Sequence, residues 1–120
     1  MIRPVQYYSA AKAAMLNTTV RLAQEFPGKG VTVTLHSPGS IHIPVVERVA
    51  RGVARQLEWG TDHWSDIEKR FAQEPVPTLT SGIGRVEDVA NAVAFLVSPL
   101  AGFITAASLR IDGGNIKSIL

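Results

Sequence analysis

Two side chains near the start of the chain have the types and the spacing for proton transfer. Tyr8 and Lys12 stand four residues apart, so on a helix they lie on the same face, one turn apart. A positive charge held close to a phenol favours its ionised form. Such a phenol can exchange a proton with the oxygen of a substrate carbonyl or alcohol. The spacing therefore predicts a general acid or base, Tyr8, with Lys12 as its electrostatic partner.

The same segment also fits a second chemistry. Ser9 and Lys12 form a Ser-x-x-Lys pattern, in which a lysine one turn away accepts the proton of a nucleophilic serine. This reading predicts a small serine esterase or hydrolase, and it requires no nucleotide cofactor. Loss of ester hydrolysis on Ser9→Ala would support it.

The elements that must position these residues alternate between helices and strands. Helical periodicity ends near Pro27 and Gly28, alternation marks two short apolar runs as strands, and glycine and proline punctuate the loops. The order helix, strand, helices, strand allows the two strands to pair in parallel through a right-handed crossover. The sequence thus predicts an α/β chain with helices over residues 8–26, 45–57, 64–71 and 86–98 and strands over 31–35 and 107–111.

Length and composition exclude several classes of protein. With 120 residues, 46% of them hydrophobic, the chain suits a single domain over residues 1–120. Its basic residues are interleaved with acids and give a net charge of only +2, so we expect no nucleic-acid partner. No apolar run approaches the roughly 20 residues that cross a bilayer, and we expect no membrane association and a cytoplasmic location. The chain has no cysteine, and the spacing of His36, His42 and His63 fits no standard metal site. We therefore expect no metal, and three histidines in loops or at the surface.

Four segments in order resemble the short-chain dehydrogenase/reductase family. Tyr8 and Lys12 match its active-site helix, and Ser37-Pro38-Gly39-Ser40-Ile41 is similar to the loop that lies against the nicotinamide ring. Further on, Gly84-Arg85-Val86-Glu87-Asp88 and Leu109-Arg110-Ile111-Asp112-Gly113-Gly114 resemble the family's C-terminal signature. The resemblance covers nearly the whole chain, from Tyr8 to about Gly114.

The resemblance implies a fold, an activity and a cofactor. The fold would be the C-terminal half of a Rossmann-like, doubly wound parallel sheet, with two strands and about four helices. The activity would be hydride transfer between NAD or NADP and a small carbonyl or alcohol substrate. Tyr8 would be the general acid or base, and Lys12 would assist it and hold the nicotinamide ribose. Pro38, Gly39, Ser40 and Ile41 would bind the nicotinamide.

The resemblance also shows which parts of the family pattern this sequence lacks. The family's glycine-rich phosphate-binding turn and its catalytic serine lie further before the tyrosine than the seven residues that precede Tyr8. Ile43 stands where the family's loop often has a threonine. We therefore expect a truncated relative of the family whose activity alone is weak or absent. We also expect it to form a homo-oligomer, or to associate with a separate N-terminal half. A non-catalytic, self-associating module is the remaining alternative.

Overall fold

The computed structural model describes residues 4–80 and 82–117, and side chains from residue 6 onward. These residues form two compact units. The first comprises Met1–His36 and Val93–Leu109, and the second comprises Ser37–Ala92 and Arg110–Leu120. The expectation of a single domain over residues 1–120 stays a prediction.

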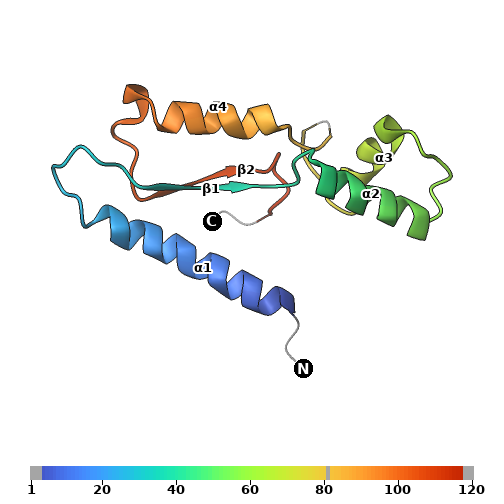
Figure 1. Ribbon diagram of the computed structural model, residues 1–120, viewed down its shortest axis with the longest axis horizontal. Helices are drawn as coiled ribbons and strands as arrows, with labels where there is room; N and C mark the ends of the chain where they lie inside the picture. Colours follow the sequence, from blue (N-terminus) through green and yellow to red (C-terminus); the bar gives the residue numbers. More distant parts are fainter. Residues whose placement is uncertain (1–3, 81, 118–120) are drawn as a thin grey trace. The chain divides into compact units, whose positions relative to one another are not determined.

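The two strands form a parallel sheet, as the sequence predicts (Figure 1). β2 (Ala107–Ile111) has the expected bounds, whereas β1 (Thr34–Pro38) begins and ends three residues later than expected. Backbone pairing explains the shift. The amide of Ala106 donates to the carbonyl of Val33 at 2.8 Å, while the amide of Val33 turns to the hydroxyl of Thr105 at 3.0 Å. The short partner strand, and not the apolar run, therefore decides where β1 begins.

The first helix, α1 (Pro4–Ala23), begins and ends earlier than the expected range of 8–26. Proline is tolerated in a first helical turn, where its missing N–H costs no hydrogen bond. Beyond the helix, Gly28 and Gly30 have φ values of 69° and 68°, which glycine adopts without strain. Almost every described side chain of α1 is exposed, and only Thr19 and Ala23 are partly buried. Within its own unit, α1 thus has little to pack against.

The core of the chain lies in the second unit, around α2 (Pro44–Gln56) and α3 (Trp64–Phe71). The two helices pack on each other, and small alanines on the inner face of α2 allow close approach. Ile67 on α3 is fully buried, as its spacing from Trp64 and Phe71 predicts. The buried residues of this core are Ala50, Ala54, Trp59, Ile67, Phe71, Ala72 and Ile83.

The last helix, α4 (Val86–Leu96), carries Glu87 and Asp88 in its positive first turn. The carboxylate of Asp88 accepts from the amide of Arg85 at 2.7 Å. The helix ends two residues before the expected Ser98, because Ser98 instead caps the short 3₁₀ helix η1 (Pro99–Ala101). Among the described residues, four α-helices and a two-stranded parallel sheet confirm the predicted fold class. In the part of the chain that the structure describes, no helix has the length and apolar character needed to span a bilayer.

Candidate active site

The helix α1 brings Tyr8 and Lys12 together, as their spacing predicts. The ammonium of Lys12 lies over the tyrosine ring, 5.5 Å from the ring centroid. Tyr8 is 65% exposed and Lys12 is also exposed, so substrate-sized molecules can reach both groups. Ser9 is exposed on the same helical turn. The helix therefore presents the residues of both chemistries that the sequence allows.

The loop after β1 is held by close backbone contacts, starting at Gly39. The amide of Gly39 donates to the carbonyl of Ile111 at 2.9 Å. A Cβ atom at position 39 would lie 2.8 Å from the Cα and Cβ atoms of Asp112, far closer than real side chains approach. Only glycine fits here, so the Pro38-Gly39 pair sets a fixed path for the chain where it leaves the sheet.

Two residues further on, the loop pairs with the segment before α4. The amide of Gly84 donates to Ser40 at 3.0 Å, and the amide of His42 donates to Gly84 at 2.8 Å. These bonds form a parallel bridge between Ile41 and Gly84. Ile41 is buried, at 9% exposure. Residues 39–42 are thus a fixed loop with a defined backbone.

A cavity of about 540 Å³ lies beside this loop in the second unit, at the carboxyl end of the strands. In open α/β sheets this end is where ligands bind. Its lining includes Ser40, Gly84, Arg85, Asp88, Arg110 and Gly113.

The turn after β2 is held by the carboxylate of Asp112. Its two oxygens accept from the amides of Gly114 and Ile116 at 3.0 and 3.1 Å. The Ile116 bond, and then the Gly114 bond, hold the pKa of Asp112 below its ordinary value of 3.8. The Asp112-Gly113-Gly114 segment is therefore a turn that the carboxylate of Asp112 organises.

The expected site residues divide between the two units. Tyr8, Ser9 and Lys12 belong to the first unit, and the loop Pro38–Ile41 belongs to the second. Among the described residues, no cluster of three or more histidine, aspartate or glutamate side chains could hold a metal ion.

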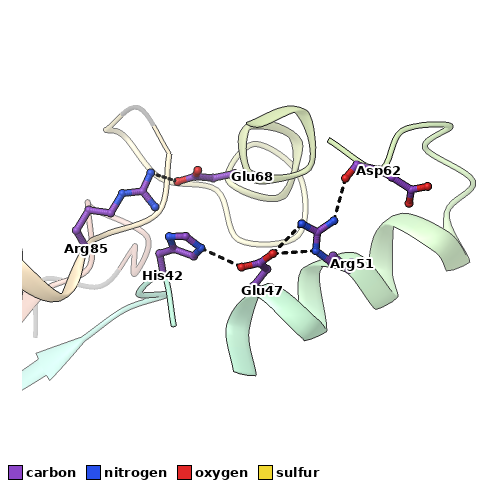
Figure 2. A network of polar contacts seen from close by, with 6 residues as sticks. All are labelled: His42, Glu47, Arg51, Asp62, Glu68 and Arg85. Atoms are coloured by element: carbon purple, nitrogen blue, oxygen red, sulfur yellow. Dashed lines mark hydrogen bonds and ion pairs between the residues drawn. The ribbon is translucent and has the colours of Figure 1, made fainter. Parts of the chain in front are cut away.

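A polar network begins at His42, for which the sequence predicts only a loop or surface position without a role. Figure 2 shows His42 beside Glu47, with Nε2 and Oε2 3.3 Å apart. Arg51 donates from Nη2 and Nε to the other oxygen of Glu47 at 2.7 and 2.9 Å, and from Nη1 to the carbonyl of Asp62 at 2.9 Å. The spacing of Glu47 and Arg51, four residues apart on a helix, indicates an ion pair. Nothing in the sequence indicates that His42 lies beside this pair.

Hydrogen bonds from Arg51 and His42 lower the pKa of Glu47 in this network. The bond from Arg51 has the larger effect, and the two bonds hold this pKa below its ordinary value of 4.5. Nearby, Arg85 pairs with Glu68 at 2.7 Å and ties α3 to the segment before α4 (Figure 2).

Comparison with known proteins identifies the class to which this fold and these residues belong. A family model described as enoyl-(acyl carrier protein) reductase matches residues 1–115. An acetoacetyl-CoA reductase from Rhizobium meliloti is 39% identical over 108 residues, which cover 90% of this chain and 38% of the relative. The 2-(S)-hydroxypropyl-CoM dehydrogenase 3 of Xanthobacter autotrophicus is 35% identical, with 89% of this chain and 38% of the relative covered.

A solved structure agrees with these matches. The NADPH-bound structure of a short chain oxidoreductase from Pseudomonas aeruginosa superposes with a TM-score of 0.73 at 27% identity, covering 92% of this chain and 38% of that one. The chain belongs to the short-chain dehydrogenase/reductase family, which confirms the resemblance seen in its sequence. It spans about 38% of the length of these relatives.

Proposed function

We propose that this chain contributes the proton-transfer and nicotinamide-side residues of an NAD(P)-dependent oxidoreductase acting on a small carbonyl or alcohol. The observation that carries the proposal is the Lys12 ammonium over the ring of Tyr8 on an exposed helix face. Membership of the family supports it.

In this proposal each residue has a defined task. A bound NAD(P)H supplies the hydride that reaches the carbonyl carbon. Tyr8 donates a proton to the carbonyl oxygen as its charge develops, and in the oxidation direction Tyr8 accepts that proton. Lys12 lies one turn from Tyr8 and holds the ribose hydroxyls. Together these steps convert a carbonyl to an alcohol with one hydride and one proton.

The described residues fit the nicotinamide side of such a cofactor. The loop Pro38–Ile41 has a fixed backbone, since Gly39 lies against Asp112 and Ile41 is bridged to Gly84. Such a loop can seat a flat ring without first being ordered. In the described part of the chain, no strand leads through a glycine-rich turn into a helix, the arrangement that binds a pyrophosphate. We therefore propose that the chain alone binds the cofactor weakly and has weak or no activity.

Substitutions on α1 test the proposal. With a fixed excess of NADPH and a small ketone, Tyr8→Phe should abolish any reduction, while Ser9→Ala should leave it nearly unchanged. NADPH absorbance reports this reaction directly.

Ester hydrolysis, followed without nucleotide, is the second arm of the experiment. Hydrolysis that depends on Ser9 and tolerates Tyr8→Phe would overturn the proposal in favour of a serine hydrolase. A chain that binds neither nucleotide nor ester, but self-associates, would overturn it in favour of a non-catalytic module.

A further inference from the structure

His42 makes contacts in two directions directly after the Ser40–Ile41 loop. Its ring stacks on the indole of Trp64, with centroids 4.7 Å apart and planes inclined by 14°. Its Nε2 lies 3.3 Å from the carboxylate of Glu47. The side chains of His42 and Glu47 are only 31% and 33% exposed. His42 thus connects the loop both to α2 and to the first residue of α3.

Trp64 packs against the buried core of the second unit, and its indole also contacts His42 and Arg51. Its Nε1 is buried and has no hydrogen-bond partner among the described residues. A buried N–H without a partner costs free energy, and it does not fix the orientation of the indole. The guanidinium of Arg51 lies 5.7 Å from the indole centroid on Trp64, and His42 stacks on the same side chain. Stacked aromatic pairs are stabilised beyond the area that they bury, so the stack on His42 adds to the core packing that orients this indole.

Glu47 and Arg51 hold the cluster in one arrangement. Glu47 uses one oxygen for Arg51 and the other for His42. Arg51 also donates to the carbonyl of Asp62 at 2.9 Å, in the connection that leads to α3 (Figure 2). The loop, α2 and the start of α3 therefore share one continuous set of contacts.

We propose that His42 is a positioning residue that couples the conformation of the preceding loop, Pro38–Ile41, to the first turn of α3 through its stack on Trp64. This inference rests on the proposed function in one respect: the loop that His42 follows is the loop assigned to the nicotinamide. A change in the loop is then transmitted to α3, and a change in α3 to the loop.

Tryptophan fluorescence tests the stack. The chain has two tryptophans, so in a Trp59→Phe background only Trp64 emits. There, His42→Ala should shift the emission of Trp64 to longer wavelength and make it more accessible to acrylamide. His42→Phe, which retains a stacking ring but not the contact with Glu47, should restore the original signal. His36→Ala, at an exposed strand position, is the matched control and should change nothing. Equal effects of His42→Phe and His42→Ala would overturn the proposal.

Amide hydrogen exchange tests the coupling in both directions and needs no Trp59 substitution. The amide of His42 bonds to Gly84, and that of Ile67 bonds to His63. Loss of one aromatic contact corresponds to about two- to tenfold faster exchange. Trp64→Leu should produce this increase at the His42 amide, and His42→Ala should produce it at the Ile67 amide, while amides of α4 keep their rates.

The outcomes separate this proposal from the proposed function. Both measurements are made without cofactor, so the coupling can be present in a chain that binds no NADPH. Unchanged exchange at both amides would overturn the coupling, and so would equal acceleration throughout α4, which would indicate general destabilisation. NADPH titration of the same variants then reports on the proposed function alone.

Discussion

Lys12 serves both of the chemistries that α1 permits, because Tyr8 lies one turn before it and Ser9 three residues before it. Its ammonium is 5.5 Å from the centroid of the tyrosine ring, so replacing Lys12 removes this contact. This residue alone therefore cannot identify the reaction. The choice between Tyr8 and Ser9 does so.

We expect Lys12→Ala to lower any reductase activity strongly, by about 10²-fold or more, the range for positioned acid–base groups. Lys12→Arg should retain part of the activity, because it keeps the charge but changes its shape. Initial rates at a fixed excess of NADPH measure this effect. Full activity in Lys12→Ala would contradict the role given to Lys12.

Asp112 makes the turn after β2 sensitive to acid. Its folded-state pKa lies below the ordinary 3.8 because the amides of Ile116 and Gly114 bond to the ionised form. Its stabilising contribution is therefore present above about pH 3.8 and is lost as the pH falls through the folded-state value. Carbon-13 NMR should show Asp112 titrating below the ordinary range. Urea unfolding of Asp112→Asn should lose this part of the pH dependence, and an unchanged profile would contradict the assignment.

At the scale of one element, α2 begins without a side-chain cap. Ile43 is its N-cap residue and makes no side-chain cap hydrogen bond, although a threonine often stands here in the family. The family's hydroxyl at this position would be available both to a helix N–H and to a bound carboxamide. An apolar residue at this boundary leaves the first N–H groups of α2 to other partners.

We expect Ile43→Thr to raise the free energy of unfolding by about 0.5–2 kcal/mol, the usual value of an N-cap hydroxyl. Ile43→Val is the matched control, since valine has the shape of threonine without its hydroxyl. Urea denaturation at neutral pH compares the two variants. A threonine variant no more stable than the valine variant would show that the cap bond does not form.

At the scale of the whole molecule, the nucleotide supplies a quantitative test. Much of the affinity for a dinucleotide comes from pyrophosphate contacts at a helix N-terminus, and among the described residues no strand leads through a glycine-rich turn into a helix. We expect the 120-residue chain to bind NADPH with a dissociation constant of about 1 mM or weaker, about 4 kcal/mol or less. Fluorescence titration measures this value. Micromolar binding would contradict the expectation and indicate a rebuilt phosphate site.

The exposed apolar side chains of α1 lead us to propose a homo-oligomer, most simply a dimer. Leu16, Leu22 and Met15 are 45%, 45% and 47% exposed, and Tyr7 is 66% exposed. Burying such surface against a second copy gains roughly 25 cal/mol per Å². Light scattering at micromolar concentration should therefore report a mass above that of one chain, and Leu16→Glu should reduce it. A stable monomer with unchanged α1 exposure would contradict the proposal.

The sequence by itself determined the order of elements, the bounds of β2, the presence of a short helix at Trp64, Ile67 and Phe71, and the placing of Tyr8 with Lys12. These follow from local causes, namely helical spacing, strand alternation and turn residues. Gly39 and Gly84 were placed in their motifs by the resemblance to the family. Membership of the family was also readable, because its motifs are short and occur in order.

Only the tertiary structure decided the remainder. The start of β1 depends on where β2 can pair with it, which no local pattern in residues 31–35 encodes. The stack of His42 on Trp64 joins residues 22 positions apart through the packing of α2 on α3. The exposure of α1 likewise depends on what surrounds the helix. The spacing of its apolar residues predicts a helix, but it does not show whether a partner covers that helix.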